Sequence, residues 1–308
     1  MLQIYLPIAE MSVSVLLILG LGGITGILSG MFGVGGGFLM TPFLMFIGVP
    51  PPVAVATSAN QIVAASVSGF MGHYHRKNVD FKMGNLLLLG GLIGSSLGVW
   101  LFDILKQMGQ IDLVISLSYV ILLGSVGGLM AVESGRVILK QRRQTTAATP
   151  TATRQHYMLH QLPFKMRFPR SKLYISAVLP VTIGIVVGVM VSLMGIGGGF
   201  LIIPAMIYLL GMPTSVVIGT SLYQIIFITA HVTLLHAMTT QTVDMMLAFL
   251  LLIGSVIGAQ FGSRIATHLP AEKLRALMAI LVLSVALKLA FDLLVTPSNI
   301  YSLSVEPL

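Results

Sequence analysis

The segment GILSGMFGVGGGFLMTPFLMFIGVPPPVAVATSANQ, residues 26–61, occurs again in the second half of the chain as GVMVSLMGIGGGFLIIPAMIYLLGMPTSVVIGTSLYQ, residues 188–224. The two segments align with one inserted residue, so the chain contains one motif twice. Apolar segments that glycine interrupts at corresponding places in two halves are the best sequence indication of a binding site in a membrane transporter. The aligned positions are Gly33, Gly35, Gly36, Gly37, Phe38 and Pro42 in the first copy and Gly195, Gly197, Gly198, Gly199, Phe200 and Pro204 in the second.

The composition is that of a membrane protein. Of the 308 residues, 56% are hydrophobic and 8% are charged, and the mean hydropathy is +0.98. A soluble domain carries about 25% charged residues, so long apolar runs with few charges predict a lipid environment. The chain has no cysteine, which excludes disulfides and thiolate metal sites. Its first basic residue is Arg76, so we expect no cleaved signal peptide. The net charge of +8 lies mostly beside the apolar runs, which favours anionic lipid headgroups and not a nucleic acid as the partner.

The apolar runs predict an all-α integral membrane protein. Four runs in each half are long enough for a spanning helix, which needs about 20 residues, whereas residues 37–49 and 199–211 are too short. Each short run, with the helix before it, fits a hairpin that enters the membrane, turns at the glycines and leaves on the same side. We therefore expect two repeats, 1–135 and 173–308, each a glycine-broken hairpin followed by three transmembrane helices, with 136–172 as the linker. The ten runs are 12–32, 37–49, 53–72, 83–102, 113–132, 173–194, 199–211, 215–235, 245–265 and 274–295.

The basic residues predict the orientation of the repeats. The linker is rich in Lys and Arg, which places it in the cytoplasm, and its Thr, Ala, Gln and Pro content predicts an irregular chain. A hairpin plus three spans crosses the membrane an odd number of times, so the second repeat is inverted and both termini lie outside. A parallel arrangement with four spans in each half would put Arg264, Lys273 and Arg275 outside, which fits the positive-inside pattern less well.

Glycines spaced by four residues extend the repeat beyond the opening motif. This spacing places them on one helix face, where a second helix can approach closely, and we expect a packing role for them. They are Gly90, Gly94 and Gly98 in the first half and Gly254, Gly258 and Gly262 in the second.

The two glycine turns predict an anion site that contains no charged side chain. The first N–H groups of a helix have no internal acceptor. At the start of each short helix they would face the membrane centre, together with the positive end of the helix dipole. Glycine has no Cβ, so a ligand can contact the backbone. The alternative is that the glycines only allow a tight turn and close packing. The residues at these turns are Gly35, Gly36, Gly37, Phe38, Gly197, Gly198, Gly199 and Phe200.

Polar side chains on the helix after each hairpin are further candidates for the site. Hydroxyl and amide groups could complete the coordination of an oxyanion. Alternatively, they form hydrogen bonds between helices, which is common in membranes. The candidates are Thr57, Ser58, Asn60 and Gln61 in the first repeat and Thr220, Ser221 and Gln224 in the second.

The titratable residues indicate one further role. His231 is expected inside the bilayer, where an ionisable group is functional by default, and it could carry a coupled proton. His73 and His236 are expected near span ends, at the membrane interface. Asp80 and Asp244 each open a helix and suit an N-cap. The sequence contains no Walker motif and no catalytic or metal-ligand constellation, so we expect neither a metal nor a cofactor.

The doubled G-[VI]-G-G-G-F-L-x-x-P motif, with a G-x-P turn and a Thr-Ser pair after each copy, resembles the TauE/SafE family of sulfite exporters, also called sulfonate-uptake permeases. The resemblance covers nearly the whole chain. It implies a transporter of small sulfur-containing anions such as sulfite, thiosulfate and organosulfonates. The basic linker and the Pro50-Pro51-Pro52 run depart from the pattern outside the motif. The matching residues are Gly33, Gly35, Gly36, Gly37, Pro42, Thr57, Ser58, Gly195, Gly197, Gly198, Gly199, Pro204, Thr220 and Ser221.

These patterns predict a secondary transporter in the cell membrane that moves a small sulfur-containing oxyanion by alternating access. The anion would bind at the midplane between the two turns, with a proton coupled through His231. A passive anion channel is the alternative. A membrane-embedded enzyme is less favoured, because the spans hold almost no acid–base or metal-binding residues. The small-residue helix faces suit a homodimer, but they pack helices within one protomer equally well.

Overall fold

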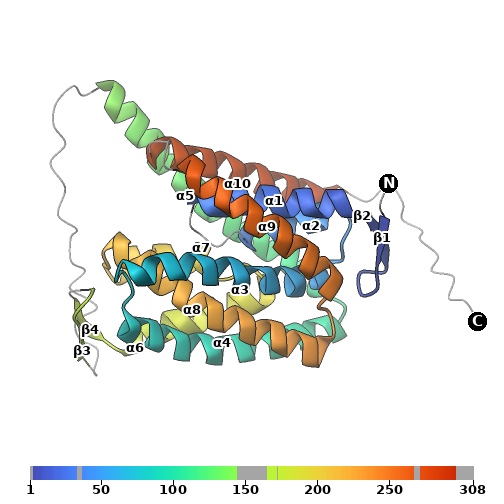
Figure 1. The fold of residues 1–308 in the computed structure, drawn as a ribbon, viewed down its shortest axis with the longest axis horizontal. Coiled ribbons are helices and arrows are strands. Elements are labelled where there is room, and N and C mark those ends of the chain that lie inside the picture. Colours follow the sequence, from blue (N-terminus) through green and yellow to red (C-terminus); the bar gives the residue numbers. More distant parts are fainter. Residues whose placement is uncertain (1–2, 33–36, 144–164, 172, 267–270, 296–308) are drawn as a thin grey trace, which may run out of the picture.

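The computed structural model describes residues 3–32, 37–143, 165–171, 173–266 and 271–295, and these are mostly helical (Figure 1). The first half contains α1 (Val15–Phe32), α2 (Gly37–Phe46), α3 (Pro51–His75), α4 (Phe81–Gln107) and α5 (Ile111–Arg143). The second half contains α6 (Val178–Met194), α7 (Gly199–Pro204) with its π-helical continuation η2 (Ala205–Leu209), α8 (Thr214–Leu235) with its π-helical continuation η3 (His236–Thr240), α9 (Met245–Ala266) and α10 (Ala271–Leu294).

Two short β-hairpins correct the expectation of an all-α chain. β1 (Gln3–Leu6) pairs antiparallel with β2 (Met11–Ser14), and β3 (Lys165–Phe168) pairs antiparallel with β4 (Leu173–Ser176). Each hairpin precedes the first helix of its half, and Figure 1 shows the two hairpins at opposite ends of the helix bundle. Strands of four residues are too short to show a periodicity in the sequence, so the pattern of apolar residues did not reveal them.

Among the described residues, six helices are long and apolar enough to cross a membrane, whereas the sequence predicts eight. The first helix of each half is shorter, with apolar parts at Val15–Met31 and Val178–Met194. At 1.5 Å per residue, 17 residues reach about 26 Å, which is less than the hydrocarbon thickness of about 30 Å. The short α2 and the α7–η2 segment follow directly, as expected for a hairpin that enters the membrane and returns.

Regular structure extends into the predicted linker. α5 continues to Arg143, and the β3–β4 hairpin occupies most of Lys165–Ser176. The linker, expected to be largely irregular, thus has regular structure at both ends, while residues 144–164 lie outside the described residues.

The first helix of each half packs against a helix of the other half. α1 packs against α9, and α6 packs against α4. The predicted glycine faces make both contacts: a Cβ atom built on Gly94 would lie 2.1 Å from the carbonyl oxygen of Ile185, and one on Gly258 would lie 2.1 Å from that of Gly23. The packing role expected for these glycines is confirmed, because only a residue without a side chain allows the two backbones to approach so closely.

Two buried aspartates join the halves a second time. Asp80 and Asp244 are the predicted N-caps, and their Oδ1 atoms accept hydrogen bonds from the N–H groups of Met83 and Leu247 at 3.2 and 3.0 Å. The N–H of Asp80 donates to Thr220 Oγ1 at 3.0 Å, and the N–H of Asp244 donates to Thr57 Oγ1 at 3.1 Å. Each aspartate is thus bonded to a threonine of the other half. We call these contacts the Asp–Thr pairs.

The second carboxylate oxygen of each aspartate holds a β-hairpin. Asp80 Oδ2 accepts hydrogen bonds from Ser171 N at 3.1 Å and Ser171 Oγ at 2.6 Å, in the turn between β3 and β4. Asp244 Oδ2 accepts one from Ile8 N at 3.2 Å, in the turn between β1 and β2. The buried carboxylate therefore explains why both halves begin with a hairpin: its turn supplies the donors that a buried charge requires.

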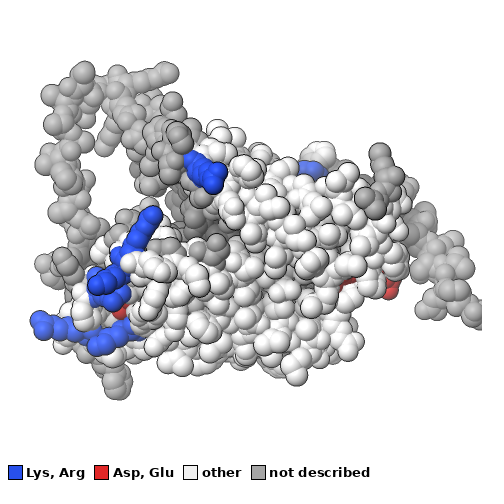
Figure 2. Space-filling view, viewed as in Figure 1, with Lys and Arg blue, Asp and Glu red and all other residues white. Residues whose placement is uncertain are grey.

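The charged residues gather at the ends of the bundle (Figure 2). The end with β3 and β4 carries exposed Lys and Arg side chains, and Arg170 Nη1 of that hairpin donates to the carbonyl of Val79 at 2.8 Å. On the face shown in Figure 2, the surface between the two ends carries few charged side chains, as expected of a surface that faces lipid. The basic cluster is Arg76, Lys77, Lys82, Arg167 and Arg170.

The Asp–Thr pairs generate a stability prediction. Thr57→Val keeps the shape of the side chain but leaves the buried N–H of Asp244 without an acceptor, which costs about 1–3 kcal/mol. We expect the variant, purified in detergent without any anion, to unfold at a lower temperature than the wild type. Thr57→Ser retains the hydroxyl and is the matched control. A Thr57→Val variant as stable as the control would show that the Thr57 hydroxyl has no structural role.

Candidate functional site

The second glycine turn connects α6 to α7 and lies inside the protein. Gly195, Gly197 and Gly198 have φ values of 66°, 74° and 79°, in the left-handed region that favours glycine. Residues 191–200 are all buried. The first glycine turn, including the predicted site residues Gly35 and Gly36, lies outside the described residues; Gly37 opens α2.

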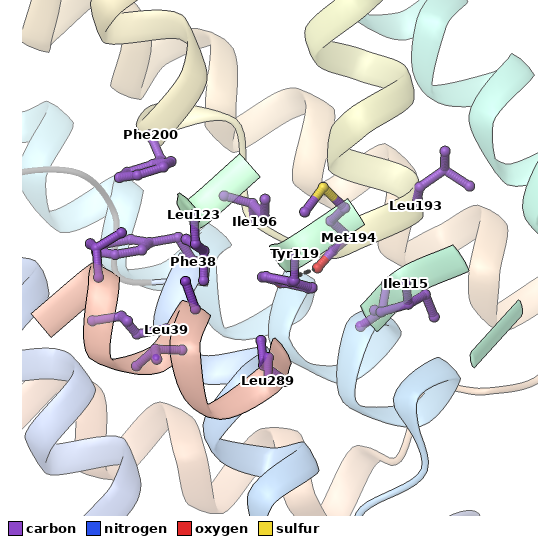
Figure 3. Close-up of a cluster of buried hydrophobic side chains, with 14 of the residues drawn as sticks. Phe38, Leu39, Ile115, Tyr119, Leu123, Leu193, Met194, Ile196, Phe200 and Leu289 are labelled. Atoms are coloured by element: carbon purple, nitrogen blue, oxygen red, sulfur yellow. Dashed lines mark hydrogen bonds between the residues drawn. The ribbon is translucent and has the colours of Figure 1, made fainter. Parts of the chain in front are cut away.

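Three side chains from other helices cap the carbonyl end of α6. Ser58 Oγ on α3 donates to the carbonyl of Gly195 at 3.3 Å, and a ring nitrogen of His236 on η3 lies 3.1 Å from the carbonyl oxygen of Ser192. The hydroxyl of Tyr119 on α5 donates to the carbonyl of Met194 (Figure 3). A helix end inside lipid needs such partners, so these bonds hold the backbone that enters the turn.

The amino end of α7 has no comparable partners. The N–H groups of Gly199 and Phe200 form no hydrogen bond with any other described residue, and α7 continues through η2 as one helical segment, Gly199–Leu209. Free N–H groups and the positive end of a dipole at a buried helix start favour a bound anion. The carbonyl side of this turn is therefore hydrogen-bonded within the protein, whereas the N–H groups of Gly199 and Phe200 have no partner among the described residues.

The two short helices meet at their amino ends. The Phe38 ring on α2 stacks on the Phe200 ring on α7, with centroids 4.6 Å apart and an angle of 12° between the planes (Figure 3). A Cβ atom built on Gly37 would lie 3.1 Å from the carbonyl oxygen of Ile196. The structure thus brings corresponding residues of the two motif copies together, although 162 positions separate Phe38 from Phe200.

Two glutamines occupy equivalent positions on α3 and α8 and share an unusual feature. The side chains of Gln61 and Gln224 are 3% and 1% exposed, and the Oε1 atom of each has no hydrogen-bond partner among the described residues. Gln224 Nε2 lies 3.4 Å from a Cβ atom built on Gly91, a residue that packs against Gly188 of α6. A buried amide oxygen without a partner is costly, but it only accepts hydrogen bonds, so the Nε2 amide nitrogen is the group of each glutamine that could donate to an anion.

Two neighbouring residues of α6 contact Gly91 and the glycine turn. A Cβ atom built on Gly188 would lie 2.4 Å from the carbonyl oxygen of Gly91, and one built on Gly198 would lie 3.1 Å from the Val187 side chain. Gln224 is therefore linked to α6 through Gly91, and the start of α7 through Val187. On α3, Ile62, the neighbour of Gln61, lies against Gly37 and Gly197.

The remaining predicted residues have different surroundings. Thr57 and Thr220 form the Asp–Thr pairs, so their hydroxyls join helices as the alternative interpretation predicts. Ser221 donates to the carbonyl of Ile218 in its own helix at 2.9 Å. Ser58 lies at the turn and is 2.7 Å from Thr41 Oγ1.

Asn60 is only partly buried. Sequence reasoning missed Thr41 and Tyr119. Thr41 could have been found from its place inside the motif, and Tyr119 from being a tyrosine in an otherwise apolar run.

The histidines lie in the spans as expected, His231 within Val216–Thr240 and His73 and His236 near the ends of Pro51–His75 and Val216–Thr240. His231 is partly buried, and its Nε2 lies 3.0 Å from Ser96 Oγ; its role in proton coupling stays a prediction. His236, expected at the membrane interface, is fully buried, because α4 and α6 cover the π-helical turn that carries it. Within the described part of the chain, no three His, Asp or Glu side chains lie close enough to hold a metal ion.

The comparisons with known proteins agree with this architecture. Residues 18–289 match the family described as Sulfite exporter TauE/SafE. The chain is 29% identical to the probable membrane transporter protein YjnA of Bacillus subtilis, over 91% of this chain and 100% of the relative. It is 29% identical to a probable membrane transporter protein of Xylella fastidiosa, over 89% of this chain and 94% of the relative. It is 27% identical to the probable membrane transporter protein YunE of Bacillus subtilis, over 92% and 98%.

No solved structure matches the chain. The family match covers most of the sequence and includes both glycine motifs, and the structure supplies six helices able to cross a membrane. The chain is a multi-pass membrane protein and belongs to the TauE/SafE sulfite exporter family of membrane transporters.

Proposed function

We propose that this protein is a secondary transporter that moves a small sulfur-containing oxyanion, such as sulfite, thiosulfate or an organosulfonate, across the cell membrane by alternating access. The free N–H groups at the start of α7, inside a fully buried turn, are the observation that carries this proposal. An oxyanion accepts hydrogen bonds from such groups. The family description names sulfite, which agrees with this chemistry.

The anion would bind between the two glycine turns. The N–H groups of Gly199 and Phe200 and the Nε2 amide groups of Gln61 and Gln224 are its proposed donors. All of these groups are neutral. Because the site contains no positively charged group to neutralise the anion, binding is weak enough for the anion to be released, which transport requires.

The repeats are proposed to be inverted, with the linker in the cytoplasm and both termini outside. The exchanged helix contacts, in which α1 packs on α9 and α6 packs on α4, support two equivalent halves. The hairpins at opposite ends of the bundle support opposite orientations (Figure 1). The basic cluster beside β3 and β4 supports a cytoplasmic location of that end (Figure 2).

Uptake into proteoliposomes tests the transport activity. We expect saturable flux of at least one of sulfite, thiosulfate and ethanesulfonate, and acceleration of that flux by the same anion on the opposite side. Acetate is the control for anions without sulfur. Flux that neither saturates nor shows counterflow would indicate a passive channel instead, and absence of flux from folded protein would contradict the proposed substrate class.

Gly198 provides a prediction for the turn. Gly198→Ala forces an L-residue to φ 79°, a strain of about 1–2 kcal/mol, and shifts the N–H groups that follow. We expect anion binding, measured by calorimetry in detergent, to weaken by at least tenfold. Gly211 has φ 71° and no atom within 4 Å of its Cβ position, so Gly211→Ala carries similar strain away from the site. Equal affinities in the two variants would contradict the location of the site.

Gln224 provides a second prediction, in which one substitution leaves the unfolding temperature unchanged or higher but lowers the anion affinity. Gln224→Met removes a buried amide whose oxygen has no partner, so we expect an unchanged or higher unfolding temperature. Anion affinity should fall about tenfold, corresponding to one lost hydrogen bond of about 1.4 kcal/mol. A variant that keeps its affinity would show that Gln224 does not contact the anion.

A further inference from the structure

His236 is a buried histidine with a hydrogen-bond partner at each ring nitrogen. It is 0% exposed and opens the π-helical turn η3 at the end of α8. Nε2 lies 3.1 Å from the carbonyl oxygen of Ser192, and Nδ1 lies 3.1 Å from Thr240 Oγ1. π-Helical turns are frequent at functional sites, and nothing in the proposed anion site requires an imidazole here.

The partners determine where the ring protons can be. A carbonyl oxygen only accepts, so Nε2 carries a hydrogen and donates to Ser192. In the neutral ring, Nδ1 accepts a hydrogen bond from the Thr240 hydroxyl. The Thr242 hydroxyl, 2.8 Å from Thr240 Oγ1, then donates to Thr240. Every group in this arrangement is satisfied.

The same atoms also satisfy the protonated ring. Nδ1–H then donates to Thr240 Oγ1, and the Thr240 hydroxyl turns to the backbone carbonyl of His236, which lies 2.9 Å away. The change requires rotation of one hydroxyl hydrogen and no movement of heavy atoms. The surroundings of His236 therefore accept either protonation state, which a purely structural histidine does not need.

The charged side chain that faces His236, Lys106, lies on α4. α4 places the Phe102 ring edge-on at 4.6 Å and the Lys106 ammonium 2.7 Å from the carbonyl oxygen of Thr240. α6 presents the carbonyl of Ser192, and the chain after η3 presents Thr242. Within the described residues, no carboxylate pairs with His236 or Lys106. If His236 were protonated beside Lys106, a nearby bound anion could balance the added positive charge.

The glycine turn is the place from which that anion would act. Ser192 lies three residues before Gly195, and the side chain of Val191 is 3.0 Å from a Cβ atom built on Gly198. A negative charge at the start of α7 would attract a proton to the imidazole through a region of low dielectric. The bond to Ser192 ties the ring directly to the helix that enters the turn.

We propose that His236 is a proton-binding site coupled to the anion site, so that the anion binds together with one proton held on the imidazole between Ser192 and Thr240. The proposal rests on the proposed function, because it requires anion binding at the turn. It places the coupling group at His236 and not at His231, whose Nε2 lies 3.0 Å from the Ser96 hydroxyl.

Calorimetry on the full-length protein in detergent measures this coupling. Thiosulfate is the probe, because it does not titrate near neutral pH. Titrations in two buffers of different ionisation enthalpy give the number of protons taken up with each anion. We expect about one proton in the wild type, with affinity rising up to tenfold for each unit of decrease in pH. We expect about none in His236→Gln, which can form hydrogen bonds but cannot titrate.

Three further variants complete the test. Thr240→Val removes the acceptor of the protonated Nδ1, and we expect it to abolish proton uptake. This variant tests the proposal independently, in case His236→Gln does not fold. His75→Gln, which changes an exposed histidine bonded to the carbonyl of Met71, should keep the full uptake. His231→Gln should keep it too, and loss of uptake in this variant alone would overturn the assignment to His236.

The outcomes separate the two proposals. Thiosulfate binding with undiminished proton uptake in His236→Gln or Thr240→Val overturns the coupling and leaves the transport proposal intact. Failure of the wild type to bind thiosulfate, sulfite or ethanesulfonate overturns the transport proposal, and the coupling falls with it.

Discussion

A backbone inside a bilayer has to find partners for its N–H and C=O groups within the protein, and this structure is organised around the place where that need is greatest. The chain turns inside the protein at Gly195–Gly198, so a helix end and a helix start are buried together. Ser58, Tyr119 and His236 reach the carbonyl end from three different elements. The N–H groups of Gly199 and Phe200 at the helix start have no partner among the described residues. The turn thus combines a hydrogen-bonded carbonyl end with N–H groups that favour an anion.

The rest of the architecture keeps the turn in place. The contacts of α1 with α9 and of α6 with α4 pack the first helix of each half against the other half. The Asp–Thr pairs do the same at the two ends of the bundle, where a buried carboxylate also holds a hairpin turn. Neither half could form these contacts alone, which argues for a single cooperative unit of two halves.

The absence of charged side chains from the described part of the turn has a functional consequence. A cation at the site would hold an oxyanion tightly, because ion pairs strengthen when water is excluded. Backbone N–H groups and amides provide weaker, neutral donors. A proton that arrives with the anion, held on His236, would add positive charge only while the anion is bound. Such transient neutralisation reconciles selective binding with release.

The sequence by itself determined the membrane setting, the two copies of the motif, the packing role of the glycine faces and the N-caps at Asp80 and Asp244. Each of these depends on local composition or on periodicity along one helix, which the sequence contains directly. It also indicated the right segments for the site, since Phe38 and Phe200 prove to be stacked neighbours.

Only the tertiary structure decided what the individual polar groups do. Thr57 and Gln61 lie one helical turn apart and appeared equivalent in the sequence, yet Thr57 binds Asp244, 187 positions away, whereas the Gln61 oxygen has no partner among the described residues. In the same way, Tyr119 and His236 form hydrogen bonds to carbonyls of α6 that are distant in the chain. The β-hairpins were hidden because their partners are buried aspartates of the other half. The partner of a polar side chain in a membrane protein is set by which helices meet, and that information is not local.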